Sequence, residues 1–302
     1  NRRVATDAAA KGGGVPLDKL YQTNLVNVND PTIKESDTPL YLHIPKTGGT
    51  AAGDYYACLG LVTSENLAIS EGQSSHTIID THSVAGIQQA KQLQVVQRGI
   101  ADMIITPLLP AAVEMFDSDH QARVFGLFRH PIEREVSRYY YRQIASWEPS
   151  YQPELANIPI EAFYEERKDT TDNFMISILL NKNRKTDPIT EEDLEHAKQI
   201  LQSKVLVGLT SRMEESIQRF DIYFGWTEDT KHHGDPRYNA KRSICQKDFI
   251  TKKTNSNPHE PVEKGSLVWE YLSNILYYDI QLYEYAVELF EEQTFLFEGQ
   301  DS

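Results

Sequence analysis

The residues best suited to chemistry lie at positions 41–50, which read YLHIPKTGGT. Five of them could hold a phosphate or sulfate ester: Lys46, Thr47, Gly48, Gly49 and Thr50. The lysine brings a full positive charge, and the threonines bring hydroxyl donors. The glycines let backbone N–H groups approach an anion closely, and a helix starting near residue 51 would add partial positive charge at its N-terminus. The segment therefore predicts an anion-binding loop between a strand and a helix.

The order of residues in this loop limits the enzyme class. Nucleotide triphosphatases carry G-x-x-x-x-G-K-[ST], in which the glycines precede the lysine. Here Lys46 comes first and the glycines follow it. A small-molecule kinase would need the other order and an acidic ligand for Mg²⁺, so it stays only as an alternative of another class. A glycine-rich turn without function is the plainest alternative.

A second segment, residues 123–137, has the same layout and reads RVFGLFRHPIEREVS. Its apolar strand leads into Arg129, and Pro131 stands where the first turn of a helix would begin, which suits its fixed φ and missing N–H. Ser137 follows about two helical turns after the arginine. Because a guanidinium fork can bind phosphate oxygens in a bidentate way, the segment predicts a second phosphate contact.

Together the two segments resemble the sulfotransferases that use 3′-phosphoadenosine 5′-phosphosulfate (PAPS). In that family a loop like PKTGGT binds the 5′-phosphosulfate, and an arginine and a serine, here Arg129 and Ser137, grip the 3′-phosphate. The form H-[IV]-P-K-T is similar to that of Golgi-type carbohydrate sulfotransferases, with the heparan sulfate 2-O- and 6-O-sulfotransferases as the nearest comparison. Residues 207–210 (VGLT) and 278–286 also resemble segments of the family.

The resemblance implies a P-loop-like central parallel sheet flanked by helices in a single domain. It implies in-line transfer of a sulfuryl group from PAPS to a carbohydrate hydroxyl, with Lys46 stabilising the leaving 3′-phosphoadenosine 5′-phosphate (PAP) and no metal. Protein tyrosine, sterol and other small-molecule hydroxyls stay open as acceptors, and so does an inactive lectin-like domain. The loops at 143–160 and 225–261 would set the acceptor but carry no readable motif.

A catalytic base is expected at His82. It follows residues 77–81, whose β-branched side chains predict a strand, so it would lie at a strand's carboxyl end, where open α/β sheets bind ligands. An imidazole titrates near neutral pH, as a base requires. The 2-O and 6-O type enzymes that the chain resembles carry a histidine at a comparable point.

Six other side chains are weaker candidates for the base: His43, His76, His120, His130, Asp54 and Glu133. His43 lies in the strand before the loop, where a buried and hydrogen-bonded imidazole is expected. The histidines at 76 and 120 precede strands and would lie at the wrong end of the sheet. His130 is expected to fix the turn that follows Arg129.

A basic stretch at 231–253 is the last candidate for a binding function. It ends with Lys252 and Lys253, at the place where related sulfotransferases have a loop that covers the cofactor. A solvated basic loop is equally well supported, because runs of like charge are usually solvated. The stretch also contains His-His-x-Asp, but no C-x-x-C or H-E-x-x-H pattern is present in the sequence, and no metal is expected.

Short strands alternate with helices along the chain, which predicts a mostly parallel sheet covered on both faces. Strands are expected at residues 39–44, 77–81, 101–106, 124–128 and 204–209. Helices are expected at 51–61, 84–98, 131–145, 157–166, 173–180, 190–202, 212–224 and 269–292. Thr190 and Asp193 make a capping-box-like start for one of them. Residues 226–262 are polar and rich in turn-forming residues.

The chain has 302 residues, enough for one large α/β domain, and a formal net charge of −14. This charge argues against nucleic acid as a partner and weakens the case for a highly sulfated acceptor. Residues 1–36 are expected to form a flexible stem, because small residues are followed by polar ones. Residues 37–302 are expected to form the sulfotransferase domain.

Two features bear on the cellular compartment. No apolar run approaches the ~18 residues that span a bilayer, so no membrane contact is expected from this stretch of chain. The resemblance to Golgi enzymes, with a chain that starts at Asn1, suggests the Golgi lumen and a membrane anchor outside this sequence, while a cytoplasmic place stays open. Cys58 and Cys245 could pair in a secretory compartment, but the sequence leaves this open.

Overall fold

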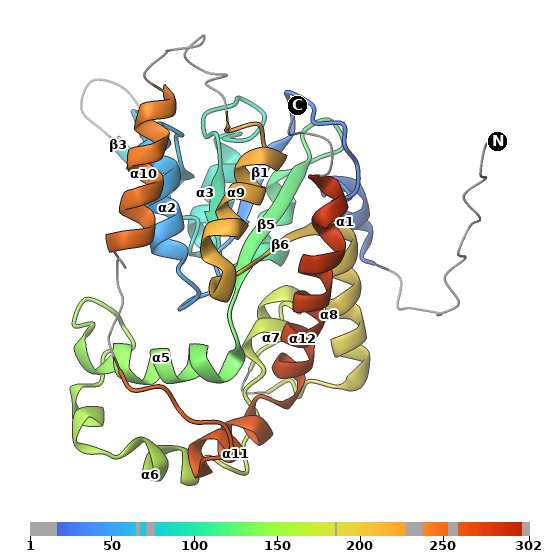
Figure 1. Cartoon of the computed structure of the whole chain (residues 1–302). Helices are drawn as coiled ribbons and strands as arrows, with labels where there is room; N and C mark the ends of the chain where they lie inside the picture. Colours follow the sequence, from blue (N-terminus) through green and yellow to red (C-terminus); the bar gives the residue numbers. More distant parts are fainter. Residues whose placement is uncertain are drawn as a thin grey trace, which may run out of the picture.

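Four parallel strands form the centre of the molecule, in the order β4-β1-β5-β6 (Figure 1). In the computed structural model they are β1 (Thr38–Leu42), β4 (Ile104–Thr106), β5 (Ala122–Phe128) and β6 (Val205–Leu209). The structure describes residues 17–64, 67–70, 76–184, 186–227, 238–252 and 259–297. Every residue of β5 and β6 is buried, which fits the apolar runs at 124–128 and 205–209; Arg123 of β5 is the charged exception and pairs with Asp37. The predicted α/β class with a central parallel sheet is confirmed.

The register of the strands brings their carboxyl ends to one edge of the sheet. Leu40 of β1 lies opposite Ile104 of β4 on one side and Val124 of β5 on the other, and all these pairings are parallel. The segments that leave β1, β5 and β6 therefore start from the same edge. Two of these segments contain the residues that the sequence singled out for anion binding.

Helices cover both faces of the sheet. Alternate residues of β1 point to opposite faces, so that Leu40 and Leu42 belong to one apolar cluster and Tyr41 to another. The first cluster includes side chains of α3 (Val84–Gln92), α7 (Phe174–Leu180), α8 (Glu191–Lys204) and α12 (Tyr277–Glu292). The second includes side chains of α2 (Gly49–Leu59), α9 (Met213–Tyr223) and α10 (Tyr238–Lys252).

A helical lobe lies at the bottom of Figure 1. Its elements are α5 (Pro131–Ile144), η3 (Pro153–Asn157), α6 (Ile160–Glu165) and α11 (Leu267–Ile275). Three of these helices, α5, α6 and α11, share a third apolar cluster, separate from the two that cover the sheet. Because α5 begins directly after β5, it connects this lobe to the carboxyl edge of the sheet. The remaining short elements are α4 (Leu109–Ala112), η2 (Val113–Met115), η4 (Thr210–Arg212) and η5 (Gln293–Leu296).

The N-terminal segment differs from the predicted stem. Residues 17–28 pack on the domain through helix α1 (Lys19–Asn24), and Leu25 pairs with Ala122 in a parallel bridge. Tyr21 and Leu25 are buried in the first apolar cluster. The stem prediction is therefore wrong for residues 17–28. Buried apolar residues such as Tyr21 and Leu25, spaced among polar ones, anchor this segment to the domain. Residues 1–16 lie outside the described residues.

The predicted strand at 77–81 does not belong to the main sheet. Instead, β3 (His76–Ile78) pairs with β2 (Ala68–Ser70) in an antiparallel ladder of their own. Residues 77–79 are β-branched, as expected of a strand. Parallel pairing needs a crossover connection of a dozen or more residues, and the connection between β2 and β3 is shorter than that. The turn that carries His82 is tied to the sheet in another way, which is described below.

Two predictions for the C-terminal third are also corrected. Residues 238–252, expected to be turn-rich, form helix α10, in which Cys245 and Phe249 are buried one turn apart. The helix expected over 269–292 is divided at Leu276 into α11 and α12. By contrast, the predicted capping box is present, since Thr190 and Asp193 exchange side-chain and backbone hydrogen bonds.

A disulfide joins Cys58 of α2 to Cys245 of α10. The two residues are separated by 187 positions in the sequence, so the bond links distant parts of the chain. It answers the question that the sequence left open. In the described ranges, no helix combines the length and apolar character needed to cross a membrane.

Candidate active site

The predicted anion loop, residues 45–50, leaves the carboxyl edge of the sheet after β1 and ends in the first turn of α2. Lys46 and Gly48 both have left-handed backbone conformations, with φ of 71° and 90°. For a lysine this conformation is uncommon and costs free energy. Gly48 also lies under Met213, whose Cε would be 2.7 Å from an added Cβ. The loop therefore turns sharply between β1 and α2.

The hydroxyl of Thr47 has a different role from the one predicted. It donates to the carbonyl of Ile44 over 2.8 Å and is fully buried, so only the backbone N–H of Thr47 remains for an anion. The carbonyl of Thr47 accepts a hydrogen bond of 3.0 Å from Thr210. This contact gives the VGLT segment at the end of β6 a physical function, because it supports the loop from the neighbouring strand. Thr50 is exposed in the first turn of α2, as an anion ligand requires.

Lys46 extends to the helical lobe. Its Nζ lies 3.5 Å from the centroid of the Tyr141 ring, on α5. Burial, followed by the positive charge of Arg129, lowers the pKa of Lys46 to about 8. Residues 139–141 are three consecutive tyrosines on this helix, and the sequence gives no sign that one of them contacts Lys46.

Arg129 contacts the anion loop, while its predicted contact with a 3′-phosphate stays a prediction. One of its Nη atoms donates to the carbonyl of Lys46 over 3.3 Å, and its Nε is 3.4 Å from a carboxylate oxygen of Glu133. Glu133, an alternative base, is thus engaged with the arginine. Ser137 lies further along α5 and is 7% exposed, so its predicted contact with a 3′-phosphate stays a prediction.

His130 fixes the turn after Arg129, as predicted. Its Nδ1 accepts from the N–H of Ile132 and caps α5. The ring contacts Trp269 and Tyr283, and burial lowers its pKa. This imidazole is therefore part of the helix start rather than a base.

The predicted base, His82, forms a pair with His43. Nε2 of His82 lies 3.1 Å from Nδ1 of His43, and its Nδ1 lies 3.7 Å from a carboxylate oxygen of Asp80. His43 was expected to be buried and satisfied within the strand; it is instead partly exposed and turned toward His82. Two histidines that lie 39 positions apart in the sequence thus meet beside the anion loop.

Thr81 brings this pair to the edge of the sheet. Its buried hydroxyl donates to the carbonyl of Ile105, in β4, over 2.6 Å. The next residue, His82, is followed by Ser83, which caps α3 by accepting from the N–H of Gly86. His82 therefore lies near the carboxyl edge of the main sheet, beside β4, although β3 before it belongs to the other sheet.

The second glycine of the loop makes room for His43. A Cβ at Gly49 would lie 2.0 Å from Cδ2 of His43 and 2.3 Å from Nε2. The imidazole thus lies directly against the first residue of α2. Any side chain at position 49 would push the ring away from this place and from its contact with His82.

Some predicted residues lie, wholly or with their side chains, outside the part of the chain that the structure describes. Lys252 is the last residue of α10 rather than part of a loop; its side chain, like all of Lys253, lies outside the described residues. The same holds for the His-His-x-Asp segment and for the side chain of His76. Among the residues that the structure describes, no group of three metal-ligating side chains is found.

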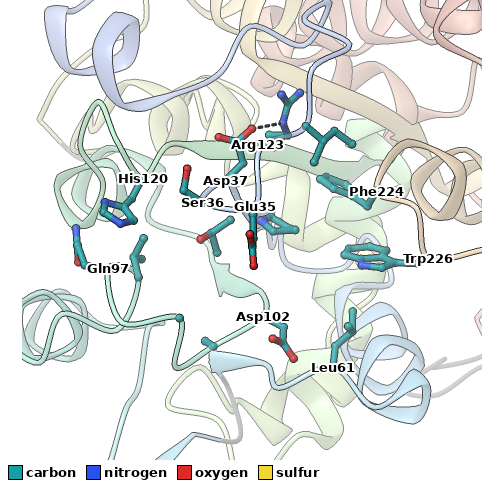
Figure 2. A pocket seen from close by; sticks show the side chains of 16 residues that line it. Glu35, Ser36, Asp37, Leu61, Gln97, Asp102, His120, Arg123, Phe224 and Trp226 are labelled. Atoms are coloured by element: carbon teal, nitrogen blue, oxygen red, sulfur yellow. Dashed lines mark hydrogen bonds and ion pairs between the residues drawn. The ribbon is translucent and has the colours of Figure 1, made fainter. Parts of the chain in front are cut away.

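A cavity of about 710 Å³ lies away from these residues (Figure 2). It borders the amino ends of β1 and β5, opposite the anion loop, and contains His120 among its lining residues. Arg123 in its wall is held by Asp37 at 2.8 Å and by the Tyr223 hydroxyl at 2.9 Å. Its position at the wrong edge of the sheet excludes it as the site of transfer.

Comparisons with known proteins bear on the family of the chain. A family model described as the sulfotransferase family matches residues 30–286. Three chains of solved structures match, among them mouse sulfotransferase SULT7A1 complexed with PAP. That chain is 14% identical, the match covers 90% of this chain and 88% of the mouse chain, and the TM-score is 0.40. No curated protein sequence matches significantly.

The contact between position 49 and His43 can be tested by a double-mutant cycle. Gly49→Ala should lower the free energy of unfolding by about 1–3 kcal/mol, because the new methyl group overpacks against the imidazole. In a His43→Ala background the same methyl group has room, and it should be neutral or stabilising by up to about 1 kcal/mol. Urea denaturation of the four proteins gives the coupling. An equal cost in both backgrounds would contradict the contact.

Proposed function

Because the chain belongs to the sulfotransferase family, we propose that it transfers the sulfuryl group of PAPS to a hydroxyl of a carbohydrate acceptor. The enzyme is PAPS-dependent. The observation that carries the proposal furthest is the meeting of Lys46 and Arg129 at a loop on the carboxyl edge of the sheet. Two cations from different strand ends suit a nucleotide that carries phosphate at both the 3′ and the 5′ position of its ribose.

Each loop group has a role in holding this substrate. The backbone N–H groups of residues 47–50 and the Thr50 hydroxyl are proposed to hold the 5′-phosphate, helped by the N-terminus of α2. Arg129 and Ser137 are proposed for the 3′-phosphate. Bound PAPS supplies the sulfuryl group, which passes to the acceptor oxygen as its bond to the 5′-phosphate breaks. Lys46 supplies positive charge beside the phosphate oxygen that gains charge in this step.

His82 is proposed as the group that takes the proton of the acceptor hydroxyl. In the proposed tautomer Nε2 of His82 carries hydrogen and donates to Nδ1 of His43, and Nδ1 of His82 takes the proton. Asp80, 3.7 Å from that nitrogen, would then stabilise the imidazolium that forms. His43 and Asp80 thus orient the base and compensate its charge, as the partners of a catalytic histidine commonly do.

A carbohydrate is the acceptor class that the exposed side chains support best. Trp147 is 69% exposed, and its ring lies 6.3 Å from that of Tyr141, which contacts Lys46. A sugar ring could stack on such a surface without a closed apolar pocket, which a sterol would prefer. The net charge of −14 favours an acceptor with few sulfate groups.

We also propose a secretory compartment, with the Golgi lumen as the specific place. The disulfide between Cys58 and Cys245 supports this proposal, because disulfides persist in oxidising compartments and are rare in the cytosol. Protein purified from the secretory pathway without reductant should show no reactive thiol until it is reduced. Two reactive thiols in the unreduced, denatured protein would count against both the pairing and the compartment.

The transfer reaction is tested with PAPS labelled in its sulfuryl group. The labelled sulfate should pass to unsulfated glycans, and not to a tyrosine peptide or a phenolic steroid. Lys46→Ala should lower transfer at least 100-fold, and wild-type transfer should fall as pH rises above about 8, where Lys46 loses its charge. Lys91→Ala, an exposed lysine of α3, serves as the matched control and should leave transfer unchanged.

Two results of this assay would count against the proposal. Transfer to the peptide or steroid alone would overturn the carbohydrate acceptor but keep the reaction. Near-normal turnover by Lys46→Ala would overturn the assignment of the anion loop.

The base is tested by comparing two histidines that each lie beside an aspartate. His82→Ala should lower kcat by about 100-fold or more while PAP binding changes little, because the group acts on the acceptor proton. His120→Ala removes the partner of Asp117 at the opposite edge of the sheet and should leave kcat unchanged. If His82→Ala instead weakened PAP binding and kept kcat, His82 would be a binding residue and not the base.

A further inference from the structure

Tyr141 is the side chain on which the ammonium group of Lys46 rests. The distance of 3.5 Å from Nζ to the ring centroid is well within the range of a cation–π interaction. Lys46 comes from the loop after β1 and Tyr141 from α5 in the helical lobe. The contact thus joins the part of the molecule that binds an anion to the part that borders the acceptor side.

The Tyr141 ring is itself held in place. Its hydroxyl donates to a carboxylate oxygen of Glu148 over 3.2 Å, and its ring meets Trp147 edge-on, with 77° between the planes. On α5 it lies one turn beyond Ser137, so the two residues share a face of the helix. A ring fixed on two sides presents a defined face to the lysine.

The groups around Lys46 make the electrostatic effect of the Tyr141 ring important. Burial and Arg129 both disfavour the charged form of the lysine, and Glu148 favours it. Within the described part of the chain, Lys46 makes no ion pair with a carboxylate. The negative face of the Tyr141 ring is therefore the nearest group that compensates the ammonium directly.

We propose that Tyr141 is a positioning residue: its ring face keeps the ammonium group of Lys46 charged and in a fixed place before PAPS binds. The inference rests on the proposed function of Lys46 in sulfuryl transfer. A preset cation loses less freedom when the phosphate arrives, and it is already protonated when charge develops on the leaving oxygen. Tyr141 itself need not touch the reacting atoms.

Two substitutions separate the ring from the hydroxyl. Tyr141→Phe and Tyr141→Leu both lose the hydrogen bond to Glu148, so they differ from each other only in the aromatic face. Tyr140→Leu changes the neighbouring tyrosine of α5, which stacks on His259 at 4.8 Å, and serves as a control for disturbing the helix. Thermal melting should show all three variants folded, since both tyrosines are only half-buried.

The first measurement is made on the PAPS-free protein and needs no activity. The lysines are converted to ¹³C-dimethyl-lysines, which keep their charge, and the Lys46 signal is identified by its loss in Lys46→Arg. In the wild type, Tyr141→Phe and Tyr140→Leu, the ring should shift this signal upfield. In Tyr141→Leu the upfield shift should vanish, and the pKa of Lys46 should fall by a further amount of about half to one and a half pH units.

The second measurement follows activity against pH. Tyr141→Leu should move the alkaline limb of kcat/KM to lower pH by the same amount and lower kcat, and Tyr141→Phe should restore both. An identical Lys46 signal and pKa in Tyr141→Leu and Tyr141→Phe would overturn the role of Tyr141. A wild type that shows the ring shift but transfers nothing from PAPS would count against the proposed function instead, so the two failures are distinguishable.

Discussion

The backbone between β1 and α2 passes through two left-handed residues within a few positions, and the rest of the candidate site is arranged around this turn. It places Lys46 at φ of 71°, with the side chain directed away from the sheet toward α5. Gly48, at φ of 90°, starts α2 at an angle that brings its first turn against the ring of His43. The strain of a left-handed lysine is tolerated because the surrounding contacts over-determine the turn: Thr47 is bonded to Ile44 within the loop and to Thr210 from β6.

The other residues of the site reach this turn from the neighbouring strands β5 and β4. Arg129 enters from the end of β5 and bonds to the loop backbone. His82 enters from the side of β4, held by the hydroxyl of Thr81. Each of these contacts runs from a side chain to a main-chain carbonyl, so the sheet fixes the relative positions of the charged groups before any substrate is present.

Much of this fold could be predicted from the sequence, because the physical signals lie within single short segments of the chain. The apolar runs at 124–128 and 205–209 signal strands buried on both faces, and the Thr190 capping box marks the start of α8. The two phosphate motifs were recognisable because each is a single stretch that joins a strand end to a helix start. Helix α10 was missed because its polar sequence has a weak pattern, and its place depends on Cys58 and on packing against α2.

The contacts between distant residues could not be predicted in the same way. The pairs His43–His82 and Lys46–Tyr141 bring together residues from different elements, and no period or spacing records them. Three consecutive tyrosines on α5 look alike in the sequence, yet only the third faces the lysine. The N-terminal residues were assigned to a stem for a related reason, since Leu25 reveals its role only through its bridge to Ala122.

The third apolar cluster gives the two halves of the site different freedom to change in evolution. Because the helical lobe has a core of its own, substitutions among α5, α6 and α11 can repack there without disturbing the clusters that hold the sheet and the anion loop. Residues of the lobe and residues that pack on the sheet can therefore be substituted largely independently of each other. Tyr141 of α5 is an exception, because its ring contacts Lys46 of the anion loop.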